Sequence, residues 1–194
     1  GTGNISLAAG EGNGAAAFTV GGNMTLAHDN TTDLKVFTGG NGDIFNDNFF
    51  NQDLNLNSLN LRSTGGSNND ITLGGNVTTV TSSSISLYGS DSELTISGNL
   101  NAGTSNYIYS DGNNNDITIT GDATAGTNNY IRTWSNGYNS DISIGGDLTA
   151  SNGYLDVQSY RSGITTGGDI TATSGDITLQ THTGSQDITL GGNV

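Results

Sequence analysis

The sequence contains no cysteine and no proline, and it has one methionine and one tryptophan. Without cysteine, the chain forms no disulfide and offers no thiolate as a nucleophile or a metal ligand. No apolar run approaches the roughly 18 residues of a membrane-spanning helix, so we expect no membrane insertion. For this stretch of chain, these absences argue against disulfide-rich scaffolds, thiol enzymes and helical membrane proteins.

Basic residues are also scarce, with 4 Lys and Arg against 18 Asp and Glu and a formal net charge of −14. Such an acidic surface repels nucleic acids and anionic lipid headgroups, so we expect neither as a partner. Large apolar residues are few as well, and the composition borders on that of disordered chains. A regular spacing of the apolar residues argues against disorder, because a disordered segment has no reason to keep them in register.

The chain repeats one phrase about every 23 residues, first as residues 70–77 and last as residues 187–194. The leading apolar residues are 22 to 25 positions apart and stand at Ile71, Leu94, Ile117, Ile142, Ile164 and Ile188. A second apolar column follows at Ile85, Ile108, Ile131, Leu155 and Ile177. A repeat this regular indicates one supersecondary unit stacked on copies of itself.

Each repeat is typical of three short strands joined by turns. Residues 117–119 alternate between apolar and polar, as a half-buried strand does, and residues 123–125 and 130–133 provide a second and a third side. We expect Gly121 to supply a positive φ at the first turn. No 3.6-residue periodicity occurs, which excludes helical and leucine-rich repeats. The pattern predicts an all-β fold, a right-handed parallel β-helix (β-solenoid) of about eight coils of about 23 residues.

We expect a single β-solenoid domain over residues 1–194. Residues 1–69 contain irregular coils with a longer loop near residues 39–48, whereas residues 70–194 hold regular repeats. The repeated motif extends backward through residues 18–24 and 34–36. The irregular part is therefore predicted to continue the same stack.

One polar column falls at the corner after the first strand and nearly always follows glycine. It consists of Asn23, Asp53, Asn76, Asn99, Asp122, Asp147, Asp169 and Asn193. Asn and Asp side chains hydrogen-bond bent backbone, so we predict a structural turn ladder at this corner. Asn23 and Asn76 also head glycosylation sequons, but their place in the ladder argues against modification there.

An acidic column precedes the first strands, at Asp70, Glu93, Asp116, Asp141 and Asp187. Stacked carboxylates about 5 Å apart repel one another, so either water screens them or a cation such as calcium bridges them. We predict no cofactor and no metal ion, with calcium as the alternative that this column leaves open.

An outward hydroxyl column lies beside the acidic one, at Thr19, Thr72, Thr95, Thr118, Ser143, Thr165 and Thr189. A flat threonine array is compatible with ice binding. The outward residue two positions earlier is usually acidic, however, and threonine is a common strand residue on a solvated face. Ice binding is therefore a minor alternative.

Aromatic residues gather on the outward side of the third strands. We predict that Tyr107, Tyr130 and Tyr154 form one ladder, that Tyr109, Arg132 and Asp156 form the next, and that Tyr88 and Trp134 share a third. Exposed aromatic residues clustered in this way mark a contact surface for a glycan or a protein. A cross-strand ladder that only stiffens the sheet is the competing explanation. The predicted aromatic face consists of Tyr88, Tyr107, Tyr109, Tyr130, Trp134 and Tyr154.

Catalytic constellations are hard to find in this chain. His28 and His182 lie far apart in the repeat, and no serine has a local nucleophile signature. Carboxylates are plentiful, but an acidic solenoid needs them for solubility. We therefore expect no enzyme, with a β-helical polysaccharide-degrading enzyme as a minor alternative.

The phrases at residues 69–77 and 167–172 resemble the repeats of filamentous-haemagglutinin-type bacterial exoproteins, which include two-partner-secretion and autotransporter adhesins. The resemblance covers residues 16–194 and implies a right-handed β-helix that is secreted or displayed at the bacterial cell surface. It also implies a role in adhesion, biofilm formation or extracellular matrix. The export module of that group contains N-P-N-type turns, and this stretch of chain has no proline.

The two ends of the chain suggest an alternative. Residues 5–7 have the pattern of a third-side strand, and residue 194 follows a corner, so one copy continues the repeat of another. Such a heterologous contact propagates into a filament. The predicted partners are therefore a host or cell-surface glycan or protein, or the chain itself through end-to-end stacking.

Overall fold

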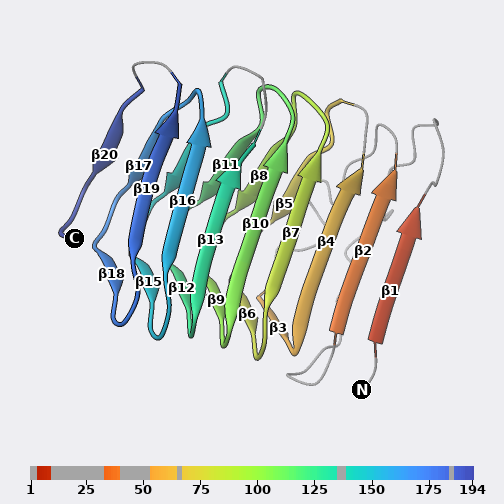
Figure 1. Ribbon diagram of the computed structural model, residues 1–194. Coiled ribbons are helices and arrows are strands. Elements are labelled where there is room, and N and C mark those ends of the chain that lie inside the picture. The colour runs from red at the N-terminus through yellow and green to blue at the C-terminus, as the bar shows by residue number, and fades with distance from the viewer. Residues whose placement is uncertain (1–3, 10–32, 40–52, 65–66, 135–138, 184–185) are drawn as a thin grey trace.

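The structure is a computed structural model that describes residues 4–9, 33–39, 53–64, 67–134, 139–183 and 186–194. Within these ranges the chain forms twenty β-strands and no helix. Every strand pair in them is parallel, and the strands stack into a β-solenoid (Figure 1). The predicted all-β parallel β-helix is confirmed.

Three sheets run along the rod. The long sheet contains, in spatial order, β1 (Asn4–Ala9), β2 (Asp33–Gly39), β4 (Ser58–Thr64), β7 (Ser83–Tyr88), β10 (Ser105–Asp111), β13 (Asn128–Thr133), β16 (Leu155–Tyr160) and β19 (Ile177–His182). The first short sheet contains β5 (Ile71–Leu73), β8 (Glu93–Ile96), β11 (Asp116–Ile119), β14 (Ile142–Ile144), β17 (Ile164–Thr166) and β20 (Ile188–Leu190). The second short sheet contains β3 (Leu54–Leu56), β6 (Val77–Thr79), β9 (Leu100–Ala102), β12 (Ala123–Ala125), β15 (Leu148–Ala150) and β18 (Ile170–Ala172).

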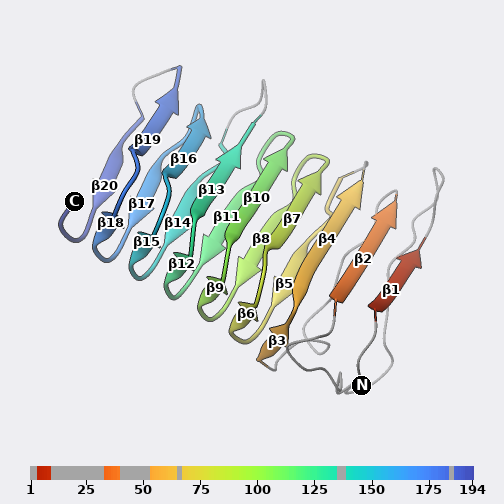
Figure 2. The ribbon, with the colours of Figure 1, turned by 60° about the horizontal axis from the view of Figure 1, so that its bottom comes forward.

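One coil passes through the three sheets in turn, for example through β11, β12 and β13. Ile117 and Ile119 point into the core while Thr118 faces outward, because side chains alternate along a strand. The chain rises along the long sheet, crosses behind it and returns along the short sheets, which makes the winding right-handed (Figures 1 and 2). Each coil therefore presents one outward row of side chains per sheet.

The number of coils is smaller than predicted. Each short sheet has six strands, and the described residues form about six turns of about 23 residues instead of about eight. The long sheet alone reaches eight strands, because β1 and β2 have no described strands of the short sheets beside them. The longer loop predicted near residues 39–48 falls almost entirely outside the described residues.

The core is a narrow column of stacked aliphatic side chains. In the long sheet one inward column runs through Leu61, Ile85, Ile108, Ile131 and Val157, all fully buried. The neighbouring inward column changes character along the rod. It passes from Leu59 through Ser83, Asn106 and Asn129 to Leu155, and all five side chains are buried.

The change of character in this inward column overturns one predicted alignment. We predicted Leu155 and Ile177 in the column of Ile131, but Leu155 pairs with Asn129, and Val157 pairs with Ile131. The predicted column was built by matching the first apolar residue of each strand from coil to coil. In β13 that position holds a buried asparagine, so the alignment slipped by two residues.

The glycines at the corners have a different cause from the one predicted. The positive-φ glycines of the described residues are Gly89 and Gly112, so Gly121 does not supply the left-handed backbone. A Cβ on Gly121 would instead lie 2.0 Å from Asn99 Oδ1 and 3.0 Å from the carbonyl carbon of Gly98. Glycine is needed there because the coil above stacks directly on the coil below.

Candidate contact face on the long sheet

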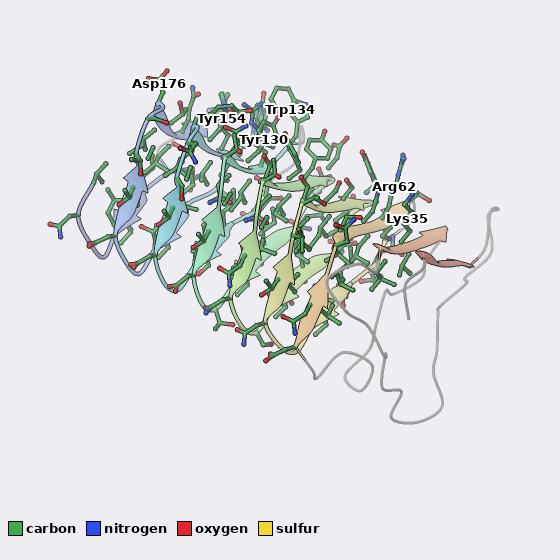
Figure 3. All side chains as sticks on the ribbon, turned by 90° about the horizontal axis from the view of Figure 1, so that it is seen from below. Lys35, Arg62, Tyr130, Trp134, Tyr154 and Asp176 are labelled. Atoms are coloured by element: carbon green, nitrogen blue, oxygen red, sulfur yellow. The ribbon has the colours of Figure 1, made fainter. Side chains whose placement is uncertain are left out.

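The outward positions of the long sheet form three columns along the rod. The first runs through Lys35, Asn60, Ser84, Tyr107, Tyr130, Asp156 and Thr178. The second runs through Arg62, Ser86, Tyr109, Arg132, Gln158 and Gln180. The third contains Tyr88 and Asp111, then Trp134, Tyr160 and His182. Figure 3 shows Lys35, Arg62, Tyr130 and Trp134 on the same side of the rod.

The rings in these columns contact one another from coil to coil. The ring centroids of Tyr107 and Tyr130 are 6.2 Å apart, and those of Tyr88 and Tyr109 are 5.8 Å apart. Trp134 lies 6.0 Å from Tyr160. These separations are typical of stabilising aromatic pairs. We call the set Tyr88, Tyr107, Tyr109, Tyr130, Trp134 and Tyr160 the aromatic strip.

Tyr160, which the predicted aromatic face does not include, is the last residue of β16 and stands beside Trp134. His182 extends the third column, since its ring stacks on Tyr160 with centroids 5.7 Å apart. The two-residue slip between β13 and β16 concealed the contact of Trp134 with Tyr160, whereas the predicted alignment of Leu155 with Ile177 already set Tyr160 opposite His182. A register that counted Asn129 as an inward residue would have found the contact of Trp134 with Tyr160.

Tyr154 is the one predicted ring that the structure separates from its ladder. It precedes β16, and its backbone N–H donates to Asn128 Oδ1, so it stands beside Asn128. Tyr130 pairs instead with Asp156, and Arg132 pairs with Gln158. The side chain of Tyr154 is nevertheless 39% exposed near the same edge of the long sheet. The pairings of Tyr107 with Tyr130 and of Tyr109 with Arg132 are confirmed.

Two arginines lie against rings of the strip. The guanidinium carbon of Arg132 is 4.2 Å from the ring centroid of Tyr130, and that of Arg62 is 5.0 Å from the ring centroid of Tyr88. Both distances are within cation–π range. Arg132 also pairs with Asp156, whereas Lys35 and Arg62 are exposed, and neither has a carboxylate in ion-pair distance among the described residues.

Charge is distributed unevenly around the rod. Outward positions of the long sheet carry Lys35, Arg62 and Arg132 together with Asp111 and Asp156. The other carboxylates with described side chains stand on the short sheets or at turns: Asp53, Asp70, Asp91, Glu93, Asp116, Asp122, Asp141, Asp147, Asp169, Asp176 and Asp187. The long sheet is therefore the least acidic face of an acidic molecule.

The phenol of Tyr109 is held in its neutral form by its surroundings. Burial, and next the negative charge of Asp111, raise the pKa of Tyr109 to about 12. Tyr107 and Trp134 are 42% and 47% exposed, although large rings are usually covered. The strip thus offers partly exposed ring faces beside the guanidinium groups of Arg62 and Arg132.

Within the described residues the corner column runs from Asp53 to Asn193; Asn23 lies outside them. Each of its side chains except that of Asn193, which ends the column, accepts a hydrogen bond from the backbone N–H of its counterpart one coil later. Asn76 Oδ1 accepts from Asn99 N at 2.8 Å, and Asn99 Oδ1 accepts from Asp122 N at 2.8 Å. Asp53, Asp122, Asp147 and Asp169 accept in the same way. The ladder is structural.

A second ladder lies on the opposite side of the first strands and was not predicted. Its members are the buried residues Asn69, Ser92, Asn115, Ser140 and Ser162. The backbone N–H of each of the first four donates to the side chain of the member one coil later. The preceding residue of each coil has a positive φ, at Asn68, Asp91, Asn114, Asn139 and Arg161. Asn and Asp tolerate this left-handed backbone better than most residues. Their recurrence before each first strand was the sequence signal from which this second ladder could have been predicted.

The acidic column also acts on the backbone. Asp116 Oδ1 accepts from Asp141 N, and Asp141 Oδ1 accepts from Gly163 N. Burial raises the pKa of the Asp116 carboxyl above its usual 3.8; the hydrogen bond from Asp141 N opposes the rise, and the charges of Asp141 and Glu93 add to it. Among the described residues, no three acidic or histidine side chains are grouped closely enough to hold a metal ion.

The hydroxyl column has the predicted register on the first short sheet, where Thr72, Thr95, Thr118, Ser143, Thr165 and Thr189 pair in order. Gly163 interrupts the acidic column beside it. A hollow of about 360 Å³ is found there, lined by Asp141, Ile142, Ser143, Gly163, Thr165, Gln186, Asp187 and Thr189. The hydroxyl row is thus flanked by carboxylates and is uneven.

No family model matches the chain, and neither a curated protein nor a solved structure matches it. Among the described residues, no helix is long and apolar enough to cross a membrane. The similarity to filamentous-haemagglutinin-type exoproteins stays a prediction. What the chain does must be inferred from its faces.

Proposed function

We propose that this chain is a non-enzymatic, secreted or cell-surface β-solenoid that acts as a structural and adhesive rod. The observation that carries the proposal is the aromatic strip on the long sheet. Neighbouring rings in one continuous patch, two of them more than 40% exposed, are typical of a contact surface. The partner is a glycan or a protein of a host or cell surface.

The arrangement of the carboxylates supports a non-enzymatic role. Hydrolysis of a polysaccharide typically uses a pair of carboxyl groups that face a shared substrate site. The stacked carboxylates of the corner and acidic columns accept backbone hydrogen bonds between coils instead. Their position in the fold is explained by structure alone.

Substitution of the strip tests the proposal. Tyr107→Thr, Tyr130→Thr and Trp134→Thr together remove exposed rings and keep β-branched strand residues. We expect retention on cells or on immobilised glycans to fall at least tenfold, with an unchanged β-sheet circular dichroism spectrum. The matched control replaces Thr72, Thr95 and Thr118 with serine on the first short sheet. Retention unchanged by loss of the rings would refute the adhesive role.

Head-to-tail stacking into a filament is the second candidate function. The register of the long sheet favours it, because Ile5 in β1 and Ile177 in β19 occupy equivalent positions in the strand pairing. The β1 strand of one copy could therefore pair with β19 of another copy in the register that the long sheet already uses. Electron microscopy decides: fibres with an axial repeat of about 4.8 Å support the filament, and separate short rods contradict it.

A further inference from the structure

The outward face of the long sheet has the properties of an interface between two copies of the chain. We infer that two rods pair face to face through this sheet, antiparallel, about a two-fold axis that passes over β10. The inference rests on the proposed function in one respect, since it names a second copy as the partner of the same contact face. Area, charge and the distribution of large and small side chains each lead to this partner.

The face has the area that a stable dimer needs. From β2 to β19 it spans seven strands. At about 4.8 Å between strands and about 3.3 Å per residue along six residues, the face covers roughly 700 Å². Standard protein interfaces bury roughly 800 Å² on each partner. Successive strands of this sheet keep nearly the same direction, so the face is long and even (Figure 1).

Charge allows two copies to meet on this side of the rod. The acidic and corner columns place carboxylates along both edges of the first short sheet, and stacking two such faces would place like charges together. The long sheet carries cations and carboxylates in comparable number. Pairing through the long sheets also turns these carboxylate columns of the two rods away from each other.

The side chains on either side of β10 are complementary in size. One strand before it, β7 presents the small residues Ser84 and Ser86; one strand after it, β13 presents Tyr130 and Arg132 in the same two columns. An antiparallel two-fold axis over β10 sets β7 of one copy against β13 of the other. Large side chains then lie opposite small ones, in an isologous contact that is used twice.

The same axis separates like charges. It sets β4, which carries Arg62, against β16 of the second copy, which carries Asp156 and Gln158. Rods paired in the parallel sense would instead place each strand opposite itself, with Arg132 against Arg132. Tyr88 also meets the strand of Trp134 in the antiparallel arrangement, which continues the aromatic contacts across the interface.

Opposite charges at one small outward position test both the pairing and its direction. Ser86→Arg sets a cation against Arg132 of the second copy, and Ser86→Glu sets a carboxylate against it. We expect Ser86→Arg to raise the dimer dissociation constant at least tenfold in sedimentation equilibrium and Ser86→Glu to leave it unchanged or lower it. Thr118→Arg on the first short sheet is the control, with no effect expected. Circular dichroism verifies that each variant is folded.

Three outcomes overturn the inference. They are a parent protein that stays monomeric at all concentrations, an Ser86→Arg variant that dimerises as the parent does, and equal weakening by Ser86→Arg and Ser86→Glu. The last result would indicate parallel rods, in which residue 86 meets itself. None of these substitutions removes a ring. A monomeric protein that still binds glycans through its rings would therefore remove the dimer and leave the adhesive proposal standing.

Discussion

Polar side chains at the corners supply the backbone of the next coil with hydrogen-bond partners. Asp122 Oδ1, for example, accepts from Asp147 N at 2.9 Å. A corner leaves its N–H outside the regular sheet ladder, and an N–H without a partner costs about 1 to 3 kcal/mol when it is removed from water. The glycine that precedes every corner residue except Asp53 makes this contact geometrically accessible.

The glycine requirement predicts a difference between two alanine substitutions. Gly121→Ala places a Cβ 2.0 Å from Asn99 Oδ1, whereas the nearest atom to a Cβ at Gly163 is 3.3 Å away. We expect Gly121→Ala to lower the free energy of unfolding by about 1 to 3 kcal/mol, as overpacked sites do. Urea denaturation measures it. Gly163→Ala should change stability little, and equal losses in both variants would contradict the steric explanation.

One residue with left-handed backbone is strained, and a substitution can relieve the strain. Thr183 has a φ of 62°, a conformation that β-branched residues rarely adopt. Asparagine tolerates it and retains an oxygen to accept the hydrogen bond from Arg161 Nε. We expect Thr183→Asn to raise the urea midpoint by an amount equivalent to roughly 1 kcal/mol. The same substitution at Thr178, an outward strand residue, should lower the midpoint; a gain at both positions would exclude strain as the cause.

The raised pKa of Asp116 predicts that removal of its charge stabilises the fold, by an amount that depends on pH. The folded state holds the proton more tightly than the unfolded state, so ionisation of Asp116 costs stability as pH rises through its folded pKa. Asp116→Asn keeps an acceptor for Asp141 N and removes the charge. We expect a higher melting temperature than the parent at pH 7 and no advantage below about pH 4. Asp176→Asn, at an exposed turn, is the control, and a pH-independent gain would contradict this account.

At the scale of the strand, the buried asparagines of the long sheet form one unit. Asn129 Nδ2 donates to Ala123 O at 3.0 Å and to Thr149 O at 2.6 Å, and its Oδ1 accepts from Asn106 Nδ2 at 2.7 Å. These bonds connect the long sheet to the second short sheet across the core. They fix which residue of β13 faces β16, where a purely aliphatic column would leave the register weakly specified.

A double-mutant cycle tests this coupling. Asn129→Leu leaves Asn106 Nδ2 without one of its acceptors and should cost about 1 to 3 kcal/mol. Asn106→Leu together with Asn129→Leu extends the aliphatic column from Leu155 back to position 106 and should recover part of the loss. The measurement is the urea unfolding free energy of the four proteins. Strictly additive losses would show that the two asparagines act independently.

Strands were more predictable from the sequence than their register. Residues 117–119 and 123–125 alternate visibly between apolar and polar, and the structure places β11 and β12 over them. Leu155 was misaligned because its partner Asn129 is polar yet buried, which hydrophobicity alone does not reveal. Most of the aromatic strip was found, since Tyr107 and Tyr130 lie in coils of regular length. Tyr160, with His182 beside it, was missed because the slip between β13 and β16 hid its contact with Trp134.

At the scale of the whole molecule, the repeat makes a rod whose sides differ in chemistry. The short sheets carry carboxylates and hydroxyls, and the long sheet carries rings with Lys35 and Arg62 (Figure 3). Local repeats impose this difference, because one outward position in each coil becomes a continuous column in the stack. A rod with one aromatic side meets a partner along its length and not at a single pocket.

Trp134 is the only tryptophan of the chain, and it stands in the strip with 47% of its surface exposed. Its fluorescence therefore reports directly on the central claim that the long sheet is the contact face. Acrylamide quenching of Trp134 should be measured on dilute protein and again on protein bound to cells, to glycans or to itself. We predict a blue-shifted emission and at least twofold weaker quenching in the bound state. Binding that leaves Trp134 as accessible as before would place the contact on another face and contradict the account.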